Sequence, residues 1–143
     1  MLKVLIVASE VSPYAKSGGL GDVTGSLPQA LQKAGVDARV VFPKYRTIKE
    51  DYLTSCEYLT GFDVTLDWRT QKADVYKIGS AEVPTYMIGN DFYFGRGGYY
   101  GYGDDNERFA FFCKAAIEFW IISTLSPMLY TVTIGKQVRS VFM

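Results

Sequence analysis

A short apolar segment near the N-terminus constrains the fold more than any other feature of the sequence. Residues 3–8 are Lys-Val-Leu-Ile-Val-Ala, and such a β-branched and aliphatic run is typical of a strand buried on both faces of a parallel sheet. A polar loop over residues 9–20 follows, then apolar residues at helical spacing over residues 21–34, then a second buried strand over residues 38–42. This order predicts a strand–helix–strand unit and an α/β fold.

Two residues of the first predicted helix carry separate expectations. Gly35 stands directly after the last periodic residue, where a helix C-cap glycine belongs. Pro28 lies inside the periodic segment. Because proline lacks a backbone N–H and its ring crowds the preceding turn, Pro28 should kink this helix or split it.

The middle of the chain has a different pattern. Residues 58–66, 73–78 and 83–88 are short strand-like stretches separated by polar turns, which predicts an antiparallel excursion or the edge of the same sheet. Residues 90–106 are rich in Gly, Tyr and Asp and are expected to form a loop.

A second helix is predicted over residues 105–119. Asp105 or Asn106 is its expected N-cap. Phe109, Phe112 and Ala116 recur at helical spacing, so they should share one buried face.

The composition excludes several classes of function. Fifteen basic and fifteen acidic residues give a formal net charge of zero, which argues against a nucleic-acid or anionic-membrane surface. No apolar run would span a bilayer, and the N-terminus has no signal-peptide pattern. Cys56 and Cys113 match no metal or redox spacing and are expected to be free thiols in a reducing cytoplasm. The chain has no histidine, and we expect neither a metal nor a cofactor.

The loop before the first helix carries the most chemical information, in Lys16-Ser-Gly-Gly-Leu-Gly-Asp-Val23. Open α/β sheets bind ligands beyond the carboxyl ends of their strands. There, Gly18 and Gly19 would let a ligand approach the backbone, and the helix would present free N–H groups and a positive dipole end. Lys16 adds the charge that a diphosphate requires, and Asp22 would face sugar hydroxyls. The alternative is a solvated lysine beside an ordinary glycine turn.

A family resemblance makes this pattern more specific. Ala8-Ser-Glu-Val-Ser-Pro-Tyr-Ala-Lys-Ser-Gly-Gly-Leu-Gly-Asp-Val23 resembles the N-terminal signature of bacterial glycogen and starch synthases, which contains the motif Lys-x-Gly-Gly-Leu. Tyr99-Tyr-Gly-Tyr-Gly-Asp-Asp105 and Glu107-Arg-Phe-Ala-Phe-Phe112 resemble later segments of the same family. The similarity runs in order over residues 2–118.

The resemblance implies two Rossmann-like domains facing a cleft, in the arrangement called GT-B. Residues 1–118 would be a truncated part of the first domain, and the second domain would lie outside this chain. The implied reaction transfers glucose from ADP-glucose to the non-reducing end of an α-1,4-glucan with retention of configuration. The chain alone should be inactive, because half of the water-poor cleft is missing.

The resemblance also implies roles for single residues. Lys16 matches a lysine that contacts ADP-glucose, and Gly18 and Gly19 match a glycine turn near the donor. Asp22 matches an acidic residue beside the transferred sugar and is the candidate catalytic residue. Tyr100 matches an aromatic residue that stacks on the glucan acceptor, although local packing is an alternative role for any tyrosine of this loop.

The last 25 residues, 119–143, form a foreign tail by composition. All fifteen acidic residues lie at or before Glu118. If the third base of each codon is joined to the first two of the next, permitted codons from Phe119 onward spell family-like sequence that includes His-Cys-Asn-Asp-Trp. We therefore expect a lost base near Phe119, with a genuine but divergent C-terminal strand or helix as the alternative.

Three alternatives to the synthase interpretation remain open at this point. The chain would be a non-catalytic module that binds a nucleotide sugar or a glucan, a flavodoxin-like or Rossmann-like protein with another phosphorylated ligand, or a truncated product without function. The sequence predicts no oligomeric state.

Overall fold

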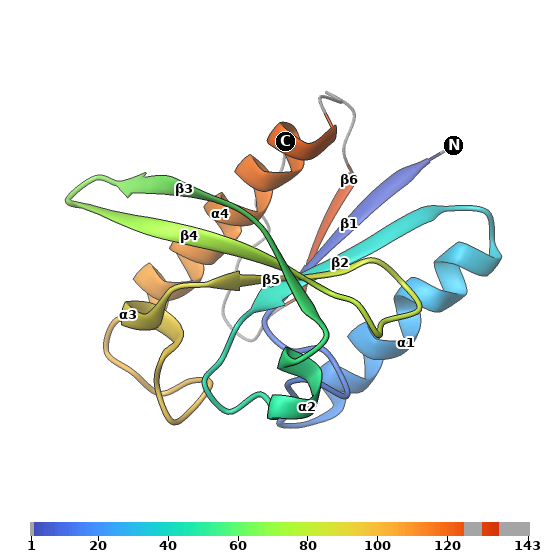
Figure 1. Ribbon diagram of the computed structural model, residues 1–143, viewed down its shortest axis with the longest axis horizontal. Coiled ribbons are helices and arrows are strands. Elements are labelled where there is room, and N and C mark those ends of the chain that lie inside the picture. Colours follow the sequence, from blue (N-terminus) through green and yellow to red (C-terminus); the bar gives the residue numbers. More distant parts are fainter. Residues whose placement is uncertain (1, 125–129, 135–143) are drawn as a thin grey trace.

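The computed structural model describes residues 2–124 and 130–134, which form a six-stranded mixed sheet with helices on both faces (Figure 1). The strand order across the sheet is β3-β4-β5-β2-β1-β6. The strands are β1 (Lys3–Ala8), β2 (Asp37–Pro43), β3 (Cys56–Leu66), β4 (Arg69–Ile78), β5 (Thr85–Gly89) and β6 (Tyr130–Ile134). The helices are α1 (Gly19–Lys33), α2 (Glu50–Leu53), α3 (Asp91–Phe94) and α4 (Asp105–Thr124).

The parallel half of the sheet confirms the predicted strand–helix–strand unit. β1 lies between β2 and β6 and is parallel to both, with Val4 opposite Ala38 on one side and Tyr130 on the other. Every residue of β1 after Lys3 is buried, as expected for a strand covered on two faces. β5 continues the parallel half on the other side of β2.

The antiparallel half confirms both expectations for the middle of the chain. β3 and β4 form a long antiparallel hairpin, and β4 pairs antiparallel with β5. The excursion is therefore also the edge of the same sheet. The tip of this hairpin, at residues 67–68, extends away from β1 and β6 (Figure 1).

Helix α1 begins two residues before its predicted start and ends one residue before its predicted end, and it is not split at Pro28. Pro28 does not split it, because α1 is one helix from Gly19 to Lys33 with Pro28 buried inside. In the turn before Pro28, α1 packs closely on the preceding loop, since a Cβ on Gly25 would lie 2.8 Å from the Ser12 carbonyl oxygen. Tertiary contact of this kind overrides the local cost of a proline. Gly35 has φ of +87°, which confirms the C-cap glycine.

Helix α4 confirms its buried face, begins at residue 105 as predicted and ends five residues later than predicted, at Thr124. Phe109, Phe112 and Ala116 are all buried. The helix already includes Asp105, so the predicted N-cap is at least one residue too late. The Asp105 carboxylate accepts hydrogen bonds from the N–H groups of Gly101 and the next residue, which stabilises the preceding turn rather than the helix end.

The expected loop over residues 90–106 contains the short helix α3. Its N-cap is Asn90, whose side chain accepts a hydrogen bond from the Tyr93 N–H at 3.0 Å. Four residues are too few to show a helical period in the sequence, so the prediction of a continuous loop is wrong at this point.

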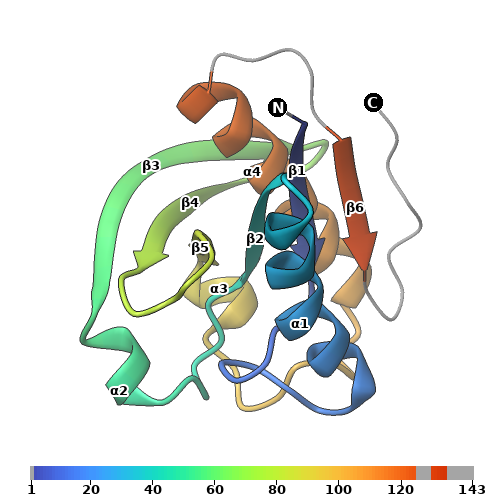
Figure 2. The same cartoon turned by 90° about the vertical axis from the view of Figure 1, so that its right-hand side faces the viewer.

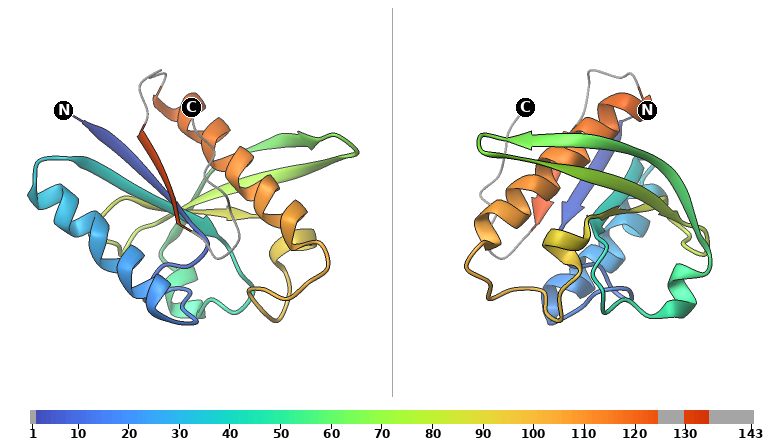
Figure 3. Two further views of the ribbon diagram at one scale, coloured as in Figure 1. Left: turned by 180° about the vertical axis from the view of Figure 1, so that it is seen from behind. Right: turned by 60° about the vertical axis from the view of Figure 1, so that its left-hand side comes forward.

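The two long helices lie on opposite faces of the sheet (Figure 2). α1 packs on β1 and β2, whereas α4 packs on the other face against β2, β3 and β5 and lies in front of the sheet in the left view of Figure 3. The α4 face of the sheet is rich in phenylalanine and tyrosine. Its fully buried aromatic side chains include Tyr93, Phe94, Phe111 and Phe112.

The residues near the predicted domain boundary belong to α4. Phe119 and Trp120 are buried, and the Phe119 ring lies 5.0 Å from that of Tyr86. A foreign tail from residue 119 onward stays a prediction, and residues 125–129 and 135–143 of it lie outside the described part. Among the described residues, no helix combines the length and the apolar character needed to cross a membrane.

Candidate functional site

The candidate site lies at the carboxyl end of β1, where the chain enters the loop before α1 (Figure 1). Because β1 is an inner strand of the parallel half, this position is where open α/β sheets bind ligands. The loop folds back on itself: Val11 and Ala15 exchange backbone hydrogen bonds at 2.9 Å. The Ser12 N–H donates to the Gly21 carbonyl, which fixes the loop on the first turn of α1.

Lys16 and Asp22 are brought together at this site. The Lys16 Nζ atom lies 2.7 Å from Asp22 Oδ1, and the two side chains are about half exposed, at 47% and 56%. An ion pair this open to solvent contributes at most about 1 kcal/mol to stability. An incoming ligand can therefore replace either partner of this ion pair at little energetic cost.

Gly18 and Gly19 lie at the N-terminus of α1 with open space beside them. Gly18 is the N-cap in extended backbone, and no side chain caps this helix end. A Cβ on either glycine would meet nothing within 4 Å. The first N–H groups of a helix have no partner inside the helix, so this end offers several donors and a positive dipole end to an anion.

Glu10 is a functional candidate that sequence analysis missed. It follows β1 by two residues and is only 2% exposed. Its Oε1 atom accepts hydrogen bonds from the N–H of Ser17 at 2.6 Å and the hydroxyl of Ser17 at 2.9 Å. Its Oε2 atom accepts a hydrogen bond from the Tyr100 hydroxyl at 2.5 Å. The carboxylate thus connects two loops. One is the glycine loop, residues 9–18 between β1 and α1, and the other is the tyrosine loop, residues 96–104.

Tyr100 is half buried, and its hydroxyl is turned toward the glycine loop. Besides Glu10, it is hydrogen-bonded to Ser9 Oγ at 2.7 Å. Burial raises the pKa of Tyr100 above its usual value, and the hydrogen bond to Glu10 raises it further, so the phenol stays protonated and acts as a donor. The ring also packs on Tyr99 and Phe109, with centroid separations of 6.2 and 5.7 Å.

Two arginines hold the tyrosine loop in place. Arg108 is fully buried; its guanidinium donates to the carbonyl oxygens of Tyr93 and Tyr99 and to the carboxylate of Asp105. Arg96 forms a two-pronged ion pair with Asp104, with N···O distances of 2.6 and 2.7 Å. This hydrogen-bonded pairing lowers the pKa of the Asp104 carboxyl below its usual value.

The structure therefore joins all five residues predicted for the site, but by two routes. Lys16, Gly18, Gly19 and Asp22 share one loop and one helix start, whereas Tyr100 reaches that loop through Glu10. Among residues 2–124 and 130–134, no group of three or more side chains has the composition of a metal site. The arrangement suits an anionic ligand at α1 with an aromatic side chain nearby.

Comparison with known proteins gives this geometry a family. The model of the starch synthase catalytic domain matches residues 3–127. The chain belongs to this family. Over 117 residues it is 49% identical to the glycogen synthase of Caldicellulosiruptor saccharolyticus, covering 82% of this chain and 24% of that protein. It is 48% identical to the glycogen synthase of Clostridium perfringens over 118 residues, with the same two coverages.

A solved structure agrees with the sequence matches. The catalytic domain of starch synthase IV from Arabidopsis thaliana, bound to ADP and acarbose, superposes with a TM-score of 0.79 at 33% identity. The match covers 91% of this chain and 27% of that one. The fold is therefore the N-terminal part of the GT-B arrangement that the resemblance implied. The chain spans about a quarter of the length of the curated relatives it matches.

Proposed function

We propose that this chain is the N-terminal part of a cytoplasmic glycogen synthase. The enzyme would transfer glucose from ADP-glucose to the non-reducing end of an α-1,4-glucan and retain the anomeric configuration. The observation that carries this proposal is the exposed Lys16–Asp22 pair beside the uncapped N-terminus of α1, at the carboxyl end of β1.

The donor half of the proposed site would work by exchange of partners. A diphosphate oxygen replaces Asp22 as the partner of Lys16, and the N–H groups that begin α1 donate to the same anion. The released Asp22 carboxylate then faces the hydroxyls of the transferred glucose. When ADP leaves, the negative charge that develops on it is stabilised by groups already in position.

The acceptor half of the proposed site would rest on Tyr100. Its hydroxyl is held by Glu10 and Ser9, so the ring has a fixed orientation. In the proposal, the apolar face of an acceptor glucose packs on this ring. Glu10 would hold the donor loop and the acceptor ring at a fixed distance from each other, since it contacts both.

The 143-residue chain is expected to be inactive by itself. A retaining transfer needs a closed cleft from which water is excluded, and the chain corresponds to about a quarter of its relatives. Robust glucan extension from ADP-glucose by this chain alone would contradict the expectation.

The proposed donor site is tested by titrating the ¹⁵N-labelled chain with ADP-glucose. We expect saturable amide shifts confined to residues 16–22, and their loss in Lys16→Ala. Lys33→Ala is the matched control, because Lys33 is an exposed lysine at the other end of α1. Equal shifts in both variants would contradict the proposed role of Lys16.

A second candidate is a binding module without turnover, which would use the Lys16 loop and Tyr100 but needs no second domain. Saturable binding of ADP-glucose or a maltooligosaccharide by a chain that never turns over, even when completed by a relative's remaining domains, would support it. A truncated product without function predicts no binding at all.

The proposed frameshift near Phe119 has its own test. The DNA from the codon of Ile117 to well past that of Met143 is read in all three frames. A shifted frame that continues into synthase sequence supports the lost base, and the absence of such a frame rejects it.

A further inference from the structure

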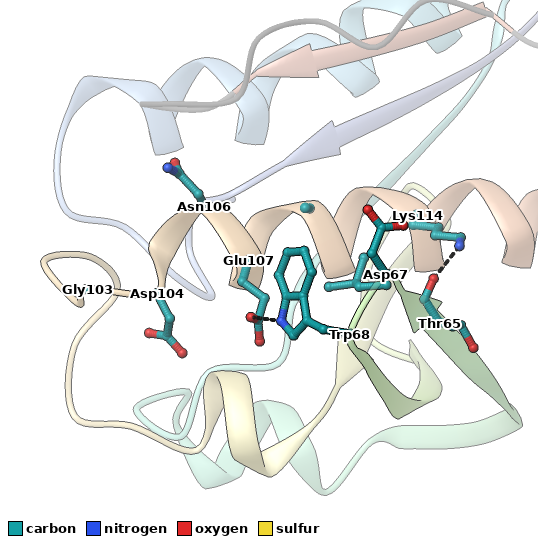
Figure 4. A pocket seen from close by; sticks show the side chains of 10 residues that line it. Thr65, Asp67, Trp68, Gly103, Asp104, Asn106, Glu107 and Lys114 are labelled. Atoms are coloured by element: carbon teal, nitrogen blue, oxygen red, sulfur yellow. Dashed lines mark hydrogen bonds between the residues drawn. The ribbon is translucent and has the colours of Figure 1, made fainter.

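We propose that the groove between the tip of the β3–β4 hairpin and the start of α4 is a second glucan-binding site, separate from the proposed transfer site. The inference rests on the proposed function, which supplies the glucan. Figure 4 shows the groove, whose volume is about 510 Å³. This volume lies within the range of small-ligand pockets. None of the five residues predicted for the transfer site lines it.

Trp68 is the main observation. It occupies the tip of the hairpin and is 67% exposed, more than any other large apolar side chain of the described residues. An apolar ligand surface that covered this indole would remove apolar area from water and so gain free energy. The flat apolar face of a glucose unit is a matching surface for such a ring.

The ring is also held in one orientation. Trp68 Nε1 donates to Glu107 Oε1 of α4 at 2.7 Å (Figure 4). On the other side of the hairpin tip, Lys114 Nζ donates to the Thr65 carbonyl oxygen. Both hydrogen bonds join the hairpin to α4, so the platform is organised before a ligand arrives, and binding costs less conformational entropy.

The charges at the groove favour a neutral ligand. Glu107 Oε2 lies 3.5 Å from Arg69 Nε and accepts a hydrogen bond from the Tyr93 hydroxyl. Asp104 is paired with Arg96. Two further charged residues, Asp67 and Lys114, line the groove and carry opposite signs. The formal charges at the groove are therefore balanced, while its oxygen atoms still accept hydrogen bonds from sugar hydroxyls.

One further polar residue, Asn106, lines the groove at the start of α4, with its side chain on the opposite side of the helix from Trp68 (Figure 4). A platform ring surrounded by neutralised polar groups is the chemistry that recognises a neutral polysaccharide. Bound there, an α-1,4-glucan would stay close to the enzyme between transfers and raise the local concentration of its chain ends.

The test is an NMR and fluorescence titration of the chain with maltoheptaose. Trp120 is only 1% exposed, so the quenching of tryptophan fluorescence by acrylamide reports mainly on Trp68. We expect maltoheptaose to protect Trp68 and to shift the amides of Gly103 and Ala110, which line the groove. Trp68→Ala should weaken binding by at least about tenfold, and Trp68→Phe should retain part of it.

Two controls separate this inference from the proposed function. Tyr58→Ala removes another exposed aromatic side chain, one of β3 outside the groove, and should bind maltoheptaose normally. Lys16→Ala should also bind it normally while losing its response to ADP-glucose. Unaltered affinity in Trp68→Ala and Trp68→Phe, or equal affinity of the chain for a cello-oligosaccharide, would overturn the inference. If the unsubstituted chain binds maltoheptaose at the groove but shows no response to ADP-glucose, that result would count against the proposed function only.

Discussion

The hydrogen bond between Tyr100 and Glu10 makes the sharpest prediction about the site. We consider Glu10→Gln and Tyr100→Phe, each of which changes only one end of the bond. The Glu10 side chain is buried, so each single variant also alters desolvation and other contacts. A double-mutant cycle cancels these effects and leaves the coupling between the two side chains.

The expected coupling follows from the geometry. The bond is short, at 2.5 Å, and its acceptor is a carboxylate. Hydrogen bonds to charged groups contribute roughly 1.5–3 kcal/mol. Because Tyr100 is half buried rather than fully buried, we expect the lower end, about 1.5 kcal/mol, in the free energy of unfolding.

The assay is urea unfolding of the parent chain, both single variants and the double variant. Glu10→Gln combined with Tyr102→Phe is the matched control, because the Tyr102 hydroxyl contacts the Gly98 N–H instead. That pair should be additive within about 0.5 kcal/mol. A coupling of the same size in both cycles, or none between Glu10 and Tyr100, would refute the proposal that Glu10 joins the two loops.

Two further predictions concern stability. The pKa of Asp104 is lowered in the fold by its hydrogen-bonded ion pair with Arg96. The stabilisation that the Asp104 carboxylate provides is therefore complete above the ordinary aspartate pKa of about 3.9. It is lost as the pH falls through the lowered pKa. Asp104→Asn should therefore cost about 1 kcal/mol at pH 7, a small value because the pair is partly exposed, and this cost should shrink as the pH falls through the lowered pKa; a cost in urea unfolding that stays the same from pH 7 to acid pH would contradict this. Gly25→Ala should destabilise the chain by about 1–3 kcal/mol, because the new methyl would lie 2.8 Å from the Ser12 carbonyl oxygen. Gly19→Ala, whose methyl meets nothing within 4 Å, should leave the melting temperature unchanged or raise it, and similar effects of both substitutions would exclude the steric explanation.

Local patterns determine the parts of the fold that the sequence predicted well. The buried strand over residues 3–8 follows from a continuous apolar run and the C-cap Gly35 from backbone conformation, and both were confirmed. Pro28 was predicted less well, because its cost is local while the packing that keeps α1 intact is tertiary. α3 was missed because a four-residue helix has no period, although Asn90 was an available N-cap signal.

The candidate site was predictable only where its residues are neighbours in the sequence. Lys16, Gly18, Gly19 and Asp22 lie within seven positions of one another, so one loop motif contained them all. Glu10 was missed because an acidic loop residue is normally solvated, and nothing local indicates that its partner Tyr100 lies 90 positions away. The Trp68 groove was missed for the same reason, since it forms only when the hairpin tip meets α4.

The central claim is that residues 1–118 supply one side of a glucosyl-transfer cleft. The most direct measurement replaces the matching N-terminal segment of the Clostridium perfringens glycogen synthase with residues 1–118 of this chain and follows incorporation of labelled glucose from ADP-glucose into glycogen. We expect an active chimera whose kcat/KM falls roughly 10²-fold in Lys16→Ala and is unchanged in Lys33→Ala. A folded chimera without activity, or one equally active with Lys16→Ala, would contradict the account.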